Sequence, residues 1–486
     1  MNDLASHAER IPAEPRAARR AALAAALACM VTLAVALGVG RFAFTPLLPL
    51  MLHSGAFGQP PIDIQHGGWL ASFNYAGYFL GALTCAALRV EPARMVRVGL
   101  ALTVLLTLAM GVTSQFWVWA AVRFVAGAVS AWTFVFASQW GLRRLAELGQ
   151  PAWSGVIYTG PGVGIVGTGL LVSAAGGYGA TAGWIGFGLI SVVLAAIVWP
   201  AFGAAAASDR ETARRGSAES VKAGRDGQSV RAGQAGATQT TGRAFPSNPD
   251  PVTADARTST GASTSTSTSA PNHAAAAIHR EASHPAIDKL TPTHRADAFW
   301  LVVLYGVPGF GYIITATFLP VIARHALPGS PWPDLFWPMF GAALIVGALL
   351  AARLPLHLDN RVLLAGSYVL QAVGIALGII WPTAGGFSLG SILIGVPFTA
   401  ITLFAMREAR RLRGNEAAGL MGYATAAYGL GQIVGPLVAA PIAARTGSFS
   451  PALWLAAGAL LLGAAGLVVV ARMPRGRGRM PDCGCA

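Results

Sequence analysis

The chain alternates between long apolar runs and short polar connections. Six apolar runs lie in the first part of the chain, at about residues 21–50, 66–88, 96–113, 117–139, 153–174 and 182–203. Six more lie in the last part, at about 298–323, 334–354, 361–381, 386–405, 416–440 and 451–471. About 20 apolar residues in a helix cross the ~30 Å hydrocarbon layer of a bilayer, so each run predicts a membrane-spanning helix. The predicted fold class is an all-α membrane protein with twelve transmembrane helices.

The character of the chain changes between the two sets of runs. Residues 204–296 are rich in Ala, Ser, Thr, Gly and Arg and hold too few apolar residues to build a core. This composition predicts a disordered cytoplasmic linker. The other predicted parts are a cytoplasmic N-terminal segment (1–20), an N-terminal six-helix bundle (21–203), a C-terminal six-helix bundle (297–472) and a cytoplasmic tail (473–486).

Composition supports the membrane assignment. The chain is 54% hydrophobic and only 11% charged, whereas about a quarter of the residues of a soluble protein are charged. The net charge of +14 does not indicate nucleic-acid binding, because most of the arginines lie in connections between apolar runs. We therefore expect a lipid bilayer and a small molecule as partners, and no nucleic acid.

The connections that carry these arginines alternate along the chain. Basic residues gather after the second, fourth, eighth and tenth runs and in the tail, for example at Arg94, Arg143, Arg361, Arg410 and Arg475. Because basic connections stay in the cytoplasm, both termini are predicted to be cytoplasmic.

The two sets of runs share sequence features. Gly38-Val39-Gly40-Arg41 in the first run resembles Gly309-Phe310-Gly311-Tyr312 in the seventh, which places Arg41 opposite Tyr312. A duplicated set of helices joined by a long loop is typical of transporters, with the substrate site between the two halves.

These motifs resemble a known family. The segment from Gly40 to Pro49, together with Gly160-Pro161-Gly162 and with Arg123 and Gly127, is similar to the major facilitator superfamily and to its bacterial YbfB/YjiJ-type branch. The resemblance implies two pseudo-symmetric six-helix bundles that work by alternating access, with the first, fourth, seventh and tenth helices lining a central cavity. One signature departs from the family, because the connection after the second run keeps arginines but lacks the usual aspartate.

The charged residues of the apolar runs suggest the chemistry of the site. Arg41 and Arg123 lie inside runs, whereas every Asp and Glu falls in a connection or at the end of a run. The resemblance would place both arginines and Tyr312 around the substrate path. An arginine without a carboxylate partner favours an anionic ligand, which it can bind through two parallel hydrogen bonds. The alternatives are that an arginine extends toward the membrane surface, or that it binds backbone carbonyls freed by Pro46 and Pro49.

Other residues are assigned to the site and to its gates. Asn74 and Tyr158 are candidate substrate contacts, and hydrogen bonds between helices are the alternative role for both. Pro46, Pro49, Pro161 and Pro308 are candidate gating positions, and static bends are the alternative. Protons are a candidate coupling ion, for which His66 titrates in a suitable range.

The predicted function is secondary active transport of a small organic anion, with substrate contacts from Arg41, Arg123, Tyr312, Asn74 and Tyr158. One rival is an efflux carrier for hydrophobic or cationic compounds, which would call for acidic residues in the cavity. Another is a non-transporting sensor or scaffold with the same fold. No enzyme activity, metal or cofactor is predicted, since the sequence shows no metal-ligand cluster and no nucleophile paired with a base. The Cys483-Gly484-Cys485 sequence has no partner ligands nearby.

Overall fold

The computed structural model describes residues 15–53, 61–85, 87–88, 90–203, 292–355, 358–413 and 417–473. The chain separates into two units, one of which holds all of these residues; the other, Arg210–Leu290, lies outside them. The predicted linker, most of the predicted N-terminal segment and the tail with its two cysteines also lie outside the described residues.

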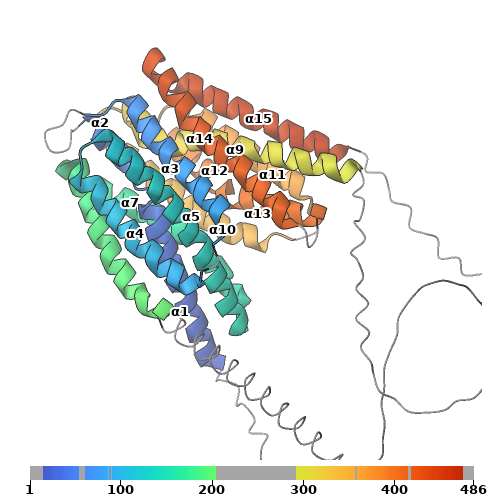
Figure 1. The fold of residues 1–486 in the computed structure, drawn as a ribbon. Helices are drawn as coiled ribbons and strands as arrows, with labels where there is room; N and C mark the ends of the chain where they lie inside the picture. The colour runs from blue at the N-terminus through green and yellow to red at the C-terminus, as the bar shows by residue number, and fades with distance from the viewer. Residues whose placement is uncertain are drawn as a thin grey trace, which may run out of the picture. The chain divides into compact units, whose positions relative to one another are not determined.

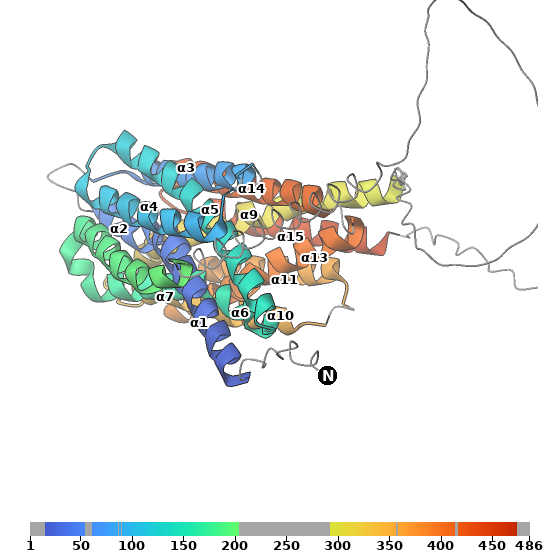
Figure 2. The same cartoon turned by 60° about the horizontal axis from the view of Figure 1, so that its bottom comes forward.

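Helices make up the first half of the described chain (Figures 1 and 2). They are α1 (Pro15–Leu33), α2 (Phe44–His53), α3 (Ile64–Thr84), α4 (Pro92–Val112), α5 (Phe116–Glu147), α6 (Ser154–Ile157) and α7 (Gly160–Ala175), followed by a helix over Gly179–Gly203. Here α1 and α2 together form the first span, and α6 and α7 form the fifth.

The second half repeats this organisation. Its helices are α9 (Pro292–Ala326), α10 (Pro333–Arg353), α11 (Asn360–Ile380), α12 (Ala384–Gly395), α13 (Pro397–Arg413), α14 (Ala417–Thr446) and α15 (Ser450–Arg472). The tenth span consists of α12 and α13. It continues past residue 405, where its apolar run stops, and its last turn holds Arg410, Arg411 and Arg413. The end of the helices where α2 ends and α3 begins is called the His53 end below, and the opposite end is called the Arg143 end.

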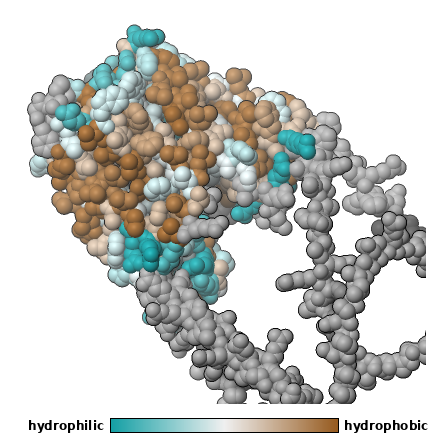
Figure 3. All heavy atoms as spheres, viewed as in Figure 1, coloured by the Kyte–Doolittle hydropathy of each residue, from teal (hydrophilic) through white to brown (hydrophobic). Residues whose placement is uncertain are grey.

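The lengths and surfaces of the helices fit a bilayer. Eleven helices among the described residues are long and apolar enough to cross a membrane, and α3 completes the predicted twelve. It is less apolar because it carries polar residues such as Gln65, His66 and Asn74. Brown, hydrophobic residues cover much of the visible face of the helical body (Figure 3). The exposed fractions of Leu105 and Leu462 are 61% and 76%, as expected of side chains that face lipid.

The first span is broken near its middle. A π-helical segment, Ala34–Val39, follows α1, and a turn over residues 40–43 precedes α2. Pro46 has no N–H group to donate to the Phe42 carbonyl, which instead accepts from the Thr45 N–H at 3.2 Å. This leaves the Arg41 carbonyl without its usual helical donor. The prolines therefore lie just beyond the break rather than at it.

The two halves pack against each other along two pairs of helices. The α3 helix packs on α14, and α7 packs on α10; Figures 1 and 2 both show α3 beside α14. Hydrogen bonds cross between the halves from the middle of the helices toward the His53 end. The Thr45 hydroxyl donates to the Ala316 carbonyl at 2.8 Å, and the Ser72 hydroxyl donates to the Ile433 carbonyl at 2.9 Å.

A buried ion-pair cluster joins helices of the second half at the Arg143 end. Arg361 of α11 donates to Glu408 of α13 at 2.7 Å and to Asp297 of α9 at 2.6 Å. It also donates to the Val470 carbonyl of α15 at 3.0 Å. Glu408, whose side chain is 1% exposed, accepts from Arg411 as well. The cluster therefore fastens four helices of this half to one another at one end.

Close packing within the first half depends on glycine. A Cβ atom on Gly77 of α3 would overlap the Phe124 carbonyl of α5, and one on Gly127 of α5 would overlap the Asn74 carbonyl. The two helices can approach this closely only because neither position carries a side chain.

We predict that Gly77→Leu destabilises the protein by about 1–3 kcal/mol or more, because the backbone of α5 must move to admit the side chain. Gly167→Leu is the matched control, since a Cβ at Gly167 meets no atom within 4 Å. Thermal unfolding of the purified protein in detergent measures both variants. Equal midpoints would contradict the packing argument.

Candidate functional site

Arg41 occupies the centre of the contact between the two halves. Its side chain starts from the turn that breaks the first span and is buried, with 5% exposure. The guanidinium carbon lies 4.2 Å from the ring centre of Tyr78 and 5.0 Å from that of Tyr75, both on α3. One guanidinium nitrogen crosses to the other half and donates to the Gln432 Oε1 atom of α14 at 2.8 Å. Arg41 therefore faces the space between the bundles and not the lipid.

Aromatic side chains of the second half lie around Gln432, on the far side of its contact with Arg41. Gln432 donates through Nε2 to the Tyr312 hydroxyl on α9. The Tyr312 ring stacks on Tyr428 at 5.9 Å between ring centres, and Tyr428 in turn stacks on Tyr305 at 5.0 Å. Phe398 meets Tyr312 edge-on at 5.0 Å. We call Tyr305, Tyr312, Phe398 and Tyr428 the aromatic wall.

The charge of Arg41 is not neutralised by a carboxylate of the described chain. The ion pairs formed by described residues lie at the ends of helices, and none of them includes Arg41. Its Nε atom has no hydrogen-bond partner among these residues, although it is buried. A buried arginine in this setting has hydrogen-bonding capacity left for a ligand.

Arg123 lies next to Arg41 but has different contacts. It is 2% exposed, and it donates to the Gly40 carbonyl at 3.3 Å and to the Arg41 carbonyl at 3.2 Å. Its guanidinium also lies 4.8 Å from the ring centre of Phe44. The side chain thus satisfies backbone carbonyls at the break of the first span, and it supports the turn from which Arg41 projects.

Asn74 and Tyr158 contact the N-terminal half. Asn74 is fully buried and donates to the Arg123 carbonyl at 2.8 Å, which links α3 to α5. Tyr158 follows α6, with its ring 6.3 Å from that of Phe134. The structure therefore brings Arg41, Arg123, Asn74 and Tyr312 into one connected region, whereas the contact of Tyr158 with Phe134 does not join that region.

The four candidate gating prolines are all buried and lie in or at the start of helices. Pro46 and Pro49 are in α2, directly after the break in the first span. Pro161 is in the first turn of α7, and Pro308 lies within α9 between Tyr305 and Tyr312.

His66 lies away from this region, at the His53 end. Its ring nitrogen is 2.8 Å from the Asp63 carboxylate, and its ring packs edge-on against Phe116 at 4.5 Å. Partial burial raises the pKa of the Asp63 carboxyl, but hydrogen bonds from the His66 backbone and ring outweigh it and hold that pKa below its usual value. His66 and Asp63 thus form a pair at the start of α3.

Sequence reasoning did not name Tyr78, and it named Tyr428 and Gln432 only as polar residues of spans that bond across helices or contact substrate. A helical spacing would have indicated them, since Tyr75 and Tyr78 are three residues apart and Tyr428 and Gln432 are four apart. Each pair therefore lies on one face of its helix. The sequence alone does not show that these two faces meet across the halves.

The fold and this central contact define a membrane transporter built from two six-helix bundles. The sequence matches the family described as "Uncharacterised MFS-type transporter YbfB" over residues 33–226 and 265–469. The chain belongs to this family, as the motif resemblance predicted.

Solved structures agree on the fold. The chain is similar to a mutant form of the nucleoside transporter NupG, with a TM-score of 0.62 and 12% identity, over 92% of this chain and 99% of that one. A second NupG structure gives a TM-score of 0.56 and 10% identity, over 93% and 100% of the two chains. No curated protein matches the sequence.

We predict that Arg123→Gln lowers thermal stability, because the shorter side chain leaves the Gly40 and Arg41 carbonyls unpaired at about 1–3 kcal/mol each. The control is Arg445→Gln, since Arg445 is exposed at the His53 end. Unfolding midpoints in detergent compare the two. A loss no larger than that of the control would mean that Arg123 does not support the break.

Proposed function

We propose that the protein is a secondary transporter that carries a small organic anion across the bacterial inner membrane by alternating access. The observation that carries this proposal is Arg41, which is buried between the halves and has no carboxylate partner among the described residues. A carboxylate of the substrate would complete the hydrogen bonding of the guanidinium and neutralise its charge. Tyr312 would add a hydroxyl contact, and the aromatic wall would cover the apolar part of the substrate.

Gln432 has a particular role in this proposal. Its amide oxygen occupies the position beside the guanidinium that a substrate carboxylate would take. Binding of the anion would replace the amide oxygen by a stronger, charged acceptor and release Gln432 from Arg41. The substrate would thereby remove one hydrogen bond that joins the halves and favour their rearrangement. Arg123 and Asn74 act in this scheme by supporting the turn that carries Arg41, while Tyr158 is a contact on the path toward the Arg143 end.

The proposed orientation places the Arg143 end in the cytoplasm, since the basic connections lie at that end. Figure 1 shows α1 and α5 running to the bottom of the helical body, whereas α9 runs to its right. The hydrogen bonds between the halves described above lie from the middle of the helices to the His53 end. This arrangement supports a site that opens toward the cytoplasm, with Pro46, Pro49, Pro161 and Pro308 as the proposed gating positions.

A second candidate substrate is an uncharged nucleoside, because the structurally similar NupG is a nucleoside transporter. The stacked rings of Tyr305, Tyr312 and Tyr428 favour a planar ligand. A nucleoside would use the aromatic wall and Gln432 but would not need the charge of Arg41. A carrier of cationic drugs is less consistent with the site, because Arg41 would repel the cargo.

We predict that Arg41→Gln abolishes the transport of organic anions, because the substrate carboxylate loses the cationic partner that faces the space between the halves. The measurement is uptake of a radiolabelled panel of organic acids and nucleosides into proteoliposomes that hold the full-length protein. Arg445→Gln, which changes an exposed arginine, is the control and should transport like wild type. If Arg41→Gln moves every transported acid at the wild-type rate, the anion proposal is wrong. Uptake of nucleosides alone would favour the second candidate.

We also predict that Gln432→Glu weakens anion binding at least about tenfold, equivalent to about 1.4 kcal/mol. The new carboxylate would pair with Arg41 permanently and compete with the substrate for it. Gln65→Glu introduces the same charge at an exposed position of α3 and is the control. Binding to the purified protein is measured by isothermal titration with the transported acid. Unchanged affinity in Gln432→Glu would show that the substrate does not replace the glutamine amide.

A further inference from the structure

Aromatic rings from both halves lie around the contact between Arg41 and Gln432. Tyr75 and Tyr78 of the first half lie against the guanidinium, with ring centres 5.0 and 4.2 Å from its carbon atom. On the side of the second half, Gln432 donates to the hydroxyl of Tyr312, which belongs to the aromatic wall. A ligand that replaces the Gln432 amide oxygen at Arg41 therefore has aromatic rings of both halves beside it.

The aromatic wall has a buried layer and a more accessible layer. Tyr305 and Tyr312 of α9 are 2% and 0% exposed. Tyr428 of α14 packs on both of these rings, and Phe398 of α13 packs on Tyr312, yet Tyr428 and Phe398 are only half-buried. These two rings therefore keep part of their surface free of the packed wall, and a ligand can contact them there.

The orientation of the rings favours a flat ligand. The plane of Tyr428 is inclined by 23° to that of Tyr305 and by 19° to that of Tyr312, so the three rings are nearly parallel. Phe398 meets Tyr312 edge-on, with an angle of 82° between the rings. Aromatic pairs prefer these two arrangements, and each pair is more favourable than its buried area alone explains. A planar ring can add to such a group, whereas a saturated ring has hydrogen atoms on both faces and approaches less closely.

The charges near the wall indicate how many carboxylates the ligand carries. Arg41 offers one positive charge, and its Nε atom is buried without a partner among the described residues. Arg123 directs two of its nitrogens to the Gly40 and Arg41 carbonyls instead. The four side chains of the aromatic wall are uncharged. A second carboxylate on the ligand would lie among these rings, and burying a charge without a partner is costly. A ligand with a single carboxylate therefore fits best.

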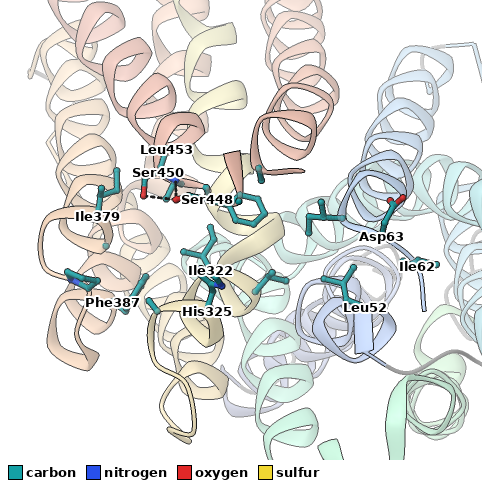
Figure 4. A pocket seen from close by; sticks show the side chains of 18 residues that line it. Leu52, Ile62, Asp63, Ile322, His325, Ile379, Phe387, Ser448, Ser450 and Leu453 are labelled. Atoms are coloured by element: carbon teal, nitrogen blue, oxygen red, sulfur yellow. Dashed lines mark hydrogen bonds between the residues drawn. The ribbon is translucent and has the colours of Figure 1, made fainter. Parts of the chain in front are cut away.

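The large cavity at the His53 end does not offer the same chemistry. It has a volume of about 490 Å³ and is lined from both halves, as Figure 4 shows, by residues that include Leu52, Asp63, Ile322, His325 and Leu453. Its described lining holds no arginine, lysine or tyrosine, and the Asp63 carboxylate would repel an anion. An anion with a planar ring therefore fits the central contact better than this cavity.

We infer that the transported anion is an aromatic monocarboxylate, in which one planar ring carries one carboxylate group, as in benzoate. The carboxylate binds Arg41 in place of the Gln432 amide oxygen, and the ring packs against Tyr428 and Phe398. Arg41 thus selects the charge of the substrate, and the two half-buried rings select its shape. This inference rests on the proposed function, because it names the class of anion that the same site carries.

The first test compares three acids by isothermal titration of the purified full-length protein at pH 7. Benzoate and cyclohexanecarboxylate share one carboxylate on a six-membered ring, but only benzoate is aromatic. Terephthalate adds a second carboxylate to the benzoate ring. We expect benzoate to bind about 2- to 12-fold more tightly than cyclohexanecarboxylate, the range that one aromatic pair contributes. It should bind at least about 50-fold more tightly than terephthalate, which has to bury a second charge.

Equal affinities for benzoate and cyclohexanecarboxylate would overturn the aromatic class, and equal affinities for benzoate and terephthalate would overturn the single charge.

Two variants test whether the wall is the source of the preference. Tyr428→Leu and Phe398→Leu should each lower the ratio of benzoate to cyclohexanecarboxylate affinity at least about twofold. Tyr423→Leu is the matched control on α14 and should keep the wild-type ratio, since Tyr423 is 71% exposed. The ratio compares two acids on the same folded protein, so a general loss of stability does not change it. A wild-type ratio in both wall variants would show that the ring binds elsewhere.

Uptake into proteoliposomes separates the failure of this inference from the failure of the proposed function. Uptake of benzoate and cyclohexanecarboxylate at equal rates, with both lost in Arg41→Gln, would remove the aromatic class and leave the anion transporter standing. If no acid is taken up, or if Arg41→Gln takes up benzoate at the wild-type rate, the proposed function fails and this inference fails with it.

Discussion

The central arrangement depends on how the broken first span satisfies its backbone. A break inside a bilayer leaves carbonyl groups without helical donors, and water is not available to replace them. Arg123 supplies two donors to the Gly40 and Arg41 carbonyls from a neighbouring helix. The break can therefore persist at a depth where it would otherwise be costly. Its consequence is geometric, because the side chain of Arg41 then leaves the first span toward the other half of the protein.

Arg41 and Arg123 divide two tasks between them. Arg123 donates to two backbone carbonyls of the first span and lies over the ring of Phe44, so its observed contacts support the fold. Arg41 lies against Tyr75 and Tyr78 and meets a neutral amide across the halves. Aromatic faces attract a cation without neutralising it. Arg41 therefore keeps its net charge in the region between the bundles. An anion site depends on that charge.

The apolar runs predicted the twelve spans because a run of about 20 apolar residues leaves few alternatives to a membrane helix. The same reasoning could not locate the ends of spans where polar residues continue a helix, as in α13, which extends to Arg413. The glycines and prolines of the first span predicted a bend. They did not show that a π-helical segment precedes it, because that segment depends on packing against other helices.

The site was predictable only in part. Charge within an apolar run was enough to single out Arg41 and Arg123, since such residues are rare in membrane helices. Their different acceptors follow from tertiary contacts: Arg123 reaches carbonyls of the first span, and Arg41 reaches Gln432, 391 residues away in the chain. The sequence carries no local signal for that pairing. Within the aromatic wall, Tyr305 and Tyr312 lie seven residues apart on α9, but no pattern in the sequence places Phe398 and Tyr428 of other helices beside them.

The neutral partner of Arg41 has a kinetic consequence. A hydrogen bond between a charged group and an amide contributes about 1.5–3 kcal/mol, whereas breaking a buried ion pair costs about 3–5 kcal/mol. Each ~1.4 kcal/mol removed from a barrier increases a rate about tenfold. In a carrier whose halves must separate in every cycle, an amide at residue 432 thus permits faster turnover than a carboxylate would.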